Sequence, residues 1–125
     1  MAQPKDEILA QRIRPLLAGL DGFVEKAMFG GIGFMVQGNM ACGVHKGELI
    51  VRVGPDRDAD SLARPHVRPF DMPGRPMQGW VMVAEPGFAQ DLDLEQWVRW
   101  GVDYALSLPP KESYARSAPG KPARQ

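Results

Sequence analysis

The chain has 125 residues, and its 15 basic and 15 acidic side chains cancel. This length favours one domain that buries roughly two thirds of its unfolded surface and folds without disulfides or metals, and the single cysteine, Cys42, excludes an internal disulfide framework. The longest apolar run, 27–36, is shorter than the ~18 residues of a membrane span, and the N-terminus lacks the features of a secretory signal, so we expect a cytoplasmic protein without membrane contact.

The N-terminal stretch has the pattern of an amphipathic helix. Asp6 and Glu7 favour a helix N-terminus. Apolar residues then recur at the helical period: Leu9, Ile13, Leu16, Leu17 and Leu20. Pro15 lacks an amide hydrogen and crowds the preceding turn, which predicts a kink or a break near Arg14.

Between about Val24 and Val53 the pattern changes to that of strands. Turn residues at 37–39 and 46–47 divide this segment into three consecutive antiparallel strands. In the third strand the side chains alternate, with Leu49, Val51 and Val53 on one face and Glu48, Ile50 and Arg52 on the other. We therefore expect one sheet face to meet the core and the other to be mixed, with helices mainly on one side.

The second half of the chain begins with a short charged helix over 56–63, which Pro65 ends. A proline-rich connector follows, in which 67–72 is predicted to form a short edge strand, and 80–84 a stronger one. The first three strands are too closely joined for parallel crossovers.

The last helix has the clearest local signal. Asp93 and Gln96 resemble a capping box, and apolar positions follow the 3.6-residue period from Leu94 until Pro109. The resulting order, α-β(3)-α-β(2)-α, predicts a two-layer α+β domain over residues 1–110 with an antiparallel sheet. Residues 111–125 carry four cations and one acid among Ser, Pro and Gly, and we predict a disordered basic tail.

The glycine cluster at Gly30, Gly31 and Gly33 has two interpretations. Phosphate-binding loops lead from a strand into a helix N-terminus, whereas another strand follows here. The favoured interpretation is therefore a bulged or closely packed strand at Gly30-Gly31. Cys42 and His45 could form an activated thiolate, but a spacing of three places them on opposite strand faces, so we expect a structural cysteine.

Arginines form the one local basic concentration within residues 1–110. Arg64, His66, Arg68 and Arg75 are a candidate surface for an anion or an acidic partner, because the planar guanidinium suits carboxylate and phosphate. The competing interpretation pairs them with Asp71 and nearby acids on a solvated connector. Two histidines and one cysteine provide no recognisable metal-ligand spacing, so the sequence predicts no metal or cofactor.

An ordered series of motifs resembles the TfoX/Sxy N-terminal domain family over about residues 5–110. The segments that carry the resemblance are Met28-Phe29-Gly30-Gly31, Gly38-Asn39-Met40, Glu48 to Val53, Arg68 to Met72, Gly74 to Met77 and the last helix with its tryptophans. The resemblance implies a secretion-chaperone-like α+β fold. It provides no catalytic residues, and we interpret Met28, Phe29, Gly30 and Gly31 as a structural motif.

The named members of this family carry a second, C-terminal domain and regulate natural competence as transcriptional coactivators. The resemblance therefore implies a regulatory or protein-binding module that acts through a protein partner, such as a transcription regulator. We expect no direct reading of DNA sequence, because residues 1–110 hold 11 Lys/Arg against 14 Asp/Glu. A homodimer is compatible with this interpretation. The alternative is a small enzyme or ligand-binding protein with a pocket near the Gly30-Gly31 bulge, but no nucleophile, base and supporting group can be assembled from the sequence.

Overall fold

The computed structural model describes residues 4–28, 30–72 and 75–110. Within them the elements follow in this order: α1 (Pro4–Leu17), β1 (Phe23–Met28), β2 (Gly31–Val36), β3 (Asn39–His45), β4 (Glu48–Arg52), the 3-10 helix η1 (Pro55–Arg57), α2 (Asp58–Leu62), β5 (Val67–Met72), β6 (Arg75–Val83), the 3-10 helix η2 (Glu85–Gly87) and α3 (Asp91–Ser107). Among these described helices, none is long and apolar enough to cross a membrane. The predicted tail, 111–125, lies outside the described residues.

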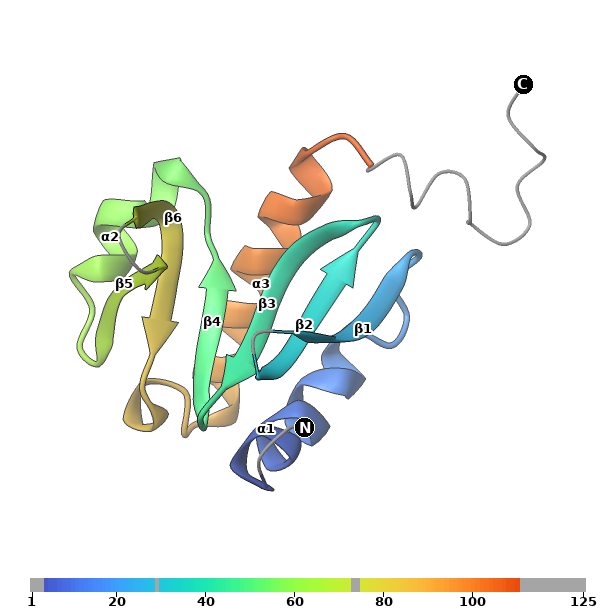
Figure 1. The fold of residues 1–125 in the computed structure, drawn as a ribbon, viewed down its shortest axis with the longest axis horizontal. Coiled ribbons are helices and arrows are strands. Elements are labelled where there is room, and N and C mark those ends of the chain that lie inside the picture. Colours follow the sequence, from blue (N-terminus) through green and yellow to red (C-terminus); the bar gives the residue numbers. More distant parts are fainter. Residues whose placement is uncertain (1–3, 29, 73–74, 111–125) are drawn as a thin grey trace.

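The strands form one six-stranded antiparallel sheet in the order β1-β2-β3-β4-β6-β5. Helix α3 runs behind β3 and β4, and α1 also packs on β2 and β3, so one layer of helices covers one sheet face (Figure 1). The predicted α+β class, the antiparallel sheet and the edge strand β5 are confirmed. The predicted order is wrong in one respect, because four strands rather than three precede α2.

A turn at Gly30 accounts for the additional strand. Met28 pairs directly with Gly31, and Gly30 has φ +77°, a left-handed conformation that favours glycine. The apolar run 27–36 therefore contains the turn between β1 and β2 and does not form a single strand. Of the two expectations for Gly30-Gly31, the bulge is wrong, since the irregularity in the β2–β3 ladder falls between Phe34 and Met35. Close packing is confirmed at Gly31, where a Cβ would collide with the carbonyl oxygen of Val44.

The main core lies between the sheet and the helix layer. Alternate residues of β2, β3, β4 and β6 point into it, and their side chains are fully buried: Phe34, Val36, Cys42, Val44, Leu49, Val51, Val81 and Val83. Helix α3 contributes Trp97, whose Nε1 donates to the carbonyl oxygen of Gly87 at 3.2 Å. Gly101 allows close approach, because a Cβ there would collide with the carbonyl oxygen of Ala41.

Both long helices differ from the predicted boundaries. Helix α1 continues through Pro15 to Leu17 without a break at Arg14, since proline so near the end removes few internal hydrogen bonds. Helix α3 begins at Asp91 after Gln90, with no side-chain cap, so the predicted capping box at Asp93 is wrong. The predicted apolar face of α3 is confirmed by its buried residues.

Candidate functional site

The sheet face opposite the helices carries a second apolar cluster. The register across the strands gives one continuous row on this face, one residue from each strand: Lys26, Gly33, Gly43, Ile50, Met82 and Arg68. Residues directly opposed in an antiparallel ladder point to the same face. The row is therefore small or apolar in the middle and cationic at both edges of the sheet.

Methionines dominate this cluster. Its buried members are Met40, Ile50 and Met82, and half-buried side chains of Met28, Met35, Phe70 and Trp80 pack against them. We call these seven residues the methionine face. Methionine is unbranched and polarizable and can fit partners of different shape, which makes such a surface adaptable.

Two glycines form the floor of the methionine face. Gly33 pairs directly with Gly43 in the β2–β3 ladder, so neither position contributes a side chain to the surface. The thioether of Met28 lies over Gly33, where it occupies the place that a Cβ would take. A flexible side chain thus fills the space above the glycines, and its movement would change the shape of the face.

A cavity of about 350 Å³ opens beside the methionine face. Its lining combines apolar Phe70 and Met82 with polar His45, Lys46, Glu48 and Arg68. Arg68 donates to Glu48 Oε1 at 2.6 Å, which fixes both side chains at the rim. The volume lies within the range of protein ligand sites, and the apolar floor with a charged rim suits an apolar group next to a charged one.

Aromatic side chains extend the methionine face toward the end of β4. The rings of Phe70 and Trp80 lie 6.1 Å apart, and the Arg52 guanidinium lies 5.0 Å from the Trp80 ring. The same guanidinium is 5.2 Å from the Tyr104 ring of α3. Stacking uses the faces of the guanidinium and leaves its N–H edges for hydrogen bonds.

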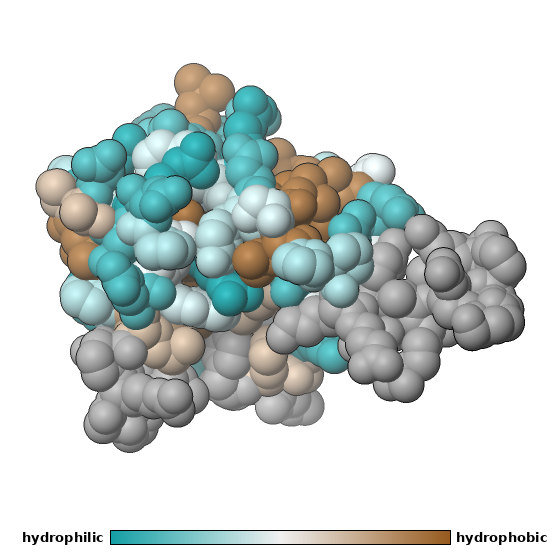
Figure 2. Space-filling view, turned by 90° about the horizontal axis from the view of Figure 1, so that it is seen from above, coloured by the Kyte–Doolittle hydropathy of each residue, from teal (hydrophilic) through white to brown (hydrophobic). Residues whose placement is uncertain are grey.

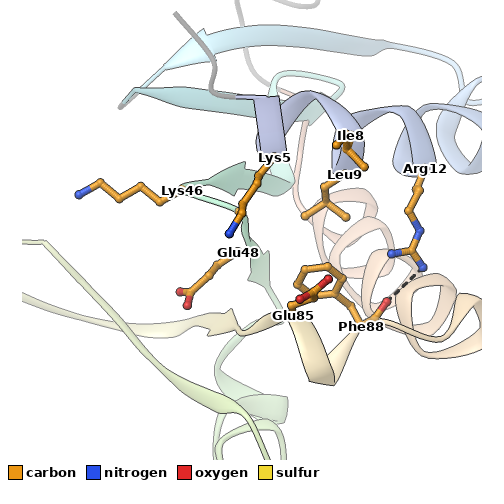
Figure 3. Close-up of a pocket in the computed structure, with 9 residues that line it drawn as sticks. Lys5, Ile8, Leu9, Arg12, Lys46, Glu48, Glu85 and Phe88 are labelled. Atoms are coloured by element: carbon orange, nitrogen blue, oxygen red, sulfur yellow. Dashed lines mark hydrogen bonds between the residues drawn. The ribbon is translucent and has the colours of Figure 1, made fainter.

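Another cavity, of about 420 Å³, lies between α1, the β3–β4 turn and η2. Figure 3 shows Leu9 and Phe88 at its base and the Lys5 side chain directed into it, with Glu85 beside Phe88. Arg12 donates to the carbonyl oxygen of Phe88 at 3.2 Å. Gly30 and Gly31, where a pocket was expected, do not line this cavity or the one beside the methionine face.

The predicted anion surface is divided between two sides of the molecule. Arg64 and His66 line one shallow cavity of about 230 Å³ with Trp97 of the helix layer. Arg68 lies on the opposite sheet face, and the side chain of Arg75 is outside the described residues. Arg64 and His66 therefore do not share a surface with Arg68, because they lie before β5 beside the helix layer, whereas Arg68 lies in β5 on the other sheet face.

Arg64 instead belongs to a cation–aromatic stack that was not predicted. The guanidinium groups of Arg64 and Arg57 lie 4.6 and 5.0 Å from the centre of the Trp100 ring. Trp97 meets Trp100 edge-on at 5.4 Å. This stack holds η1 and the residues after α2 against α3, since cation–aromatic contacts contribute about 0.5–1 kcal/mol each at partly exposed sites.

The end of the molecule seen in Figure 2 has a different character from the methionine face. Hydrophilic side chains cover most of its described surface, and hydrophobic ones form smaller groups between them. This end therefore presents a mixed surface, whereas the methionine face concentrates apolar and aromatic side chains.

Titratable groups with altered pKa values lie in the helix-facing half. Burial raises the pKa of the Cys42 thiol to about 12, which makes a thiolate nucleophile unfavourable. Hydrogen bonds from Arg14 lower the pKa of Glu25 and of Glu7, and the Arg14 side chain bridges the two carboxylates. Within the described residues, no group of three or more His, Cys, Asp or Glu could hold a metal ion.

Comparison with protein families gives a match to the TfoX N-terminal domain over residues 15–105. The chain belongs to this family. A search of curated proteins finds no match. In this family member, Gly30 of the predicted motif makes the β1–β2 turn, and Gly31 packs so closely that a Cβ would collide with the carbonyl oxygen of Val44.

Sequence reasoning did not predict the methionine face. Its members come from all six strands, and only the strand order and register place them together. The alternation of Glu48, Ile50 and Arg52 already indicated a mixed second face, and the seven methionines of the chain were a compositional signal.

Proposed function

We propose that this TfoX N-terminal domain is a protein-binding module without catalytic activity of its own, and that it influences transcription, including that of competence functions, through a protein partner. The methionine face is the observation that supports this proposal most strongly. It combines adaptable methionines, the Phe70–Trp80 pair and a neighbouring cavity on the sheet face opposite the described helices. Aromatic residues and methionine are enriched at protein interfaces.

Charge supports action through a partner rather than direct reading of DNA. Residues 1–110 hold 11 Lys/Arg against 14 Asp/Glu, and α3 displays Asp91, Asp93, Glu95 and Asp103 against Arg99. DNA affinity comes largely from neutralised phosphates, and base reading needs an element that enters a groove. Neither long helix has a consistently basic face for this role.

The proposal is tested by capture of partners from the native cell, followed by mass spectrometry. The wild-type chain is compared with Met35→Glu, which places a charge on the methionine face, and with the control Leu92→Glu, since Leu92 is 78% exposed on α3. We expect a transcription regulator to be retained by the wild type and the control and lost with Met35→Glu. Equal capture by all three chains would contradict the proposal.

A parallel measurement uses fluorescence anisotropy with labelled promoter and scrambled duplexes at ~150 mM salt, where weak phosphate-only binding is suppressed. We expect no preference for the promoter duplex by the protein alone. Submicromolar binding with a tenfold preference would contradict action through a partner.

The cavity at α1 favours a second candidate function, the binding of a small ligand. Its volume of about 420 Å³ fits small-molecule sites, and Lys5 and Glu85 offer opposite charges above apolar Leu9 and Phe88. Thermal unfolding in the presence of small zwitterionic compounds tests it, with Glu85→Gln as the variant that should lose any stabilisation. If the compound still stabilised Glu85→Gln, it would bind outside this cavity.

A further inference from the structure

The methionine face has a positive border. Lys26 and Arg68 lie at the two edges of its central row, while Arg52 and Lys46 lie toward the two ends of β4. Glu48 is the carboxylate on this border, and it is already bound to Arg68. Among the described side chains, four cations therefore surround the face against one carboxylate.

The helix layer has the opposite charge. On α3, Asp91, Asp93, Glu95 and Asp103 outnumber Arg99, and residues 1–110 are acidic as a whole. The positive border is thus specific to the methionine face and is not a general property of the domain. Charge of this kind selects oppositely charged partners and increases their rate of association.

The apolar part of the face fits a helix, which would contact its half-buried members, Met28, Met35, Phe70 and Trp80, since the other three members are at most 8% exposed. Helices bury sheet faces in layered domains, and α1 and α3 bury the other face of this sheet. The central row crosses all six strands, and with neighbouring strands ~4.8 Å apart it spans about 24 Å. A helix of about 16 residues has this length, and methionine side chains can adapt to its apolar stripe.

From these observations we infer that the methionine face binds an amphipathic helix of a partner protein whose apolar stripe is flanked by acidic residues. The inference rests on the proposed function and adds the chemistry of the partner. Because cations border the face at both sheet edges and at both ends of β4, acidic flanks of the helix meet a cation in any orientation. A basic helix would face the same cations and be repelled.

The test uses three fluorescein-labelled peptides of 18 residues and the full chain. The first has Leu and Phe at helical spacing with Glu at the other positions, the second has Lys in place of Glu, and the third is a scrambled form of the first. Anisotropy gives the affinities, and NMR of methionine methyl groups reports whether Met28, Met35, Met40 and Met82 are contacted. We expect the acidic amphipathic peptide to bind at least about tenfold more tightly than the other two.

Charge reversal provides the matched control. Lys26→Glu with Lys46→Glu should remove the preference for the acidic peptide, because both exposed cations border the face. Arg99→Glu with Leu92→Glu and Leu106→Glu makes the same change of charge on exposed positions of α3 and should leave the preference intact. Equal effects of the two multiple variants would overturn the inference.

The remaining outcomes separate the inference from the proposed function. Equal or tighter binding of the basic peptide, or equal binding of the scrambled one, overturns the inference. If no peptide binds while capture of a native partner still depends on Met35, the inference fails and the proposed function stands. A homodimer that Met35→Glu dissociates would mean that a second copy covers the face, which also overturns the inference.

Discussion

The two faces of the sheet are made by the same strands and have opposite physical character. The helix-covered face is filled by rigid side chains such as Phe34, Val44 and Val51, all fully buried. The other face carries methionines above a pair of glycines. β-branched side chains hold one rotamer and form a fixed core, whereas methionine changes shape at low cost. Alternation along a strand can therefore give a domain one permanent interface and one adaptable surface.

Glycine shows the same contrast. A Cβ at Gly101 of α3 would collide with the backbone of Ala41, which cannot move without disturbing β3. A Cβ at Gly33 would meet the end of the Met28 side chain, which can rotate away. The space beside the glycine is therefore closed by backbone on the helix side, whereas on the methionine face it is filled by a side chain that can move.

The largest effect that we expect on the helix-covered face concerns the reactivity of Cys42. Burial raises its pKa to about 12, whereas an unfolded chain has a thiol pKa near 8.5. Alkylation at pH 8 should be about 10³-fold slower in the native protein than in urea, because the thiolate is the reactive species. Iodoacetamide labelling followed by mass spectrometry measures the two rates. Similar rates would show that this face is open in solution.

Trp97→Ala should cause the largest loss of stability. Trp97 is 3% exposed in the core, and its indole donates to the Gly87 carbonyl oxygen. Loss of such a side chain costs about 3–5 kcal/mol of unfolding free energy. Urea unfolding followed by circular dichroism measures this loss. A change below about 1 kcal/mol would mean that α3 does not depend on this contact.

The two glycines permit a matched test of the comparison. Gly101→Ala should lower the unfolding free energy by about 1–3 kcal/mol, because overpacking against backbone outweighs the gain in helix propensity. Gly33→Ala should change it by less than about 1 kcal/mol, since the Met28 side chain can repack. Urea unfolding of both variants compares them directly. Equal losses would show that the methionine face is as rigid as the core.

Much of the fold was predictable because its signals are local. The apolar period of α3 and the alternation in β4 each report on neighbouring residues, and both were confirmed. The turn at Gly30 was missed because a strand glycine and a turn glycine have the same letter, and φ alone distinguishes them. The start of α3 was misplaced because an acceptable cap at Asp93 lay two residues inside the helix.

The candidate site was less predictable because it depends on contacts between distant segments. The methionine face requires the strand order and register, which no single segment encodes. Arg64 and Arg68 are close in sequence, yet the former stacks on Trp100 in the helix layer and the latter binds Glu48 across the sheet. Nearness in sequence therefore failed as a guide to a shared surface.

The smallest effect that we expect concerns the ion pair that joins α1 to the edge strand β1 on the helix-covered face. Arg14 donates to Glu25 at 2.7 Å, and this hydrogen bond lowers the pKa of Glu25 from its ordinary value of 4.5. A carboxylate with a lowered pKa adds stability that is complete above its unfolded pKa and is lost as the pH falls through its folded pKa. Glu25→Gln should therefore reduce the unfolding free energy near neutral pH and have no effect in strong acid.

The size of this effect is limited because both side chains are about one third exposed. Solvent screening reduces such pairs to less than about 1 kcal/mol. Urea unfolding at pH 7 and pH 2.5 measures the difference, with Glu95→Gln on α3 as a control outside this ion pair. If Glu25→Gln lowered stability equally at both pH values, the loss would come from packing at the edge strand. The contact between α1 and β1 would then not depend on the charge of Glu25.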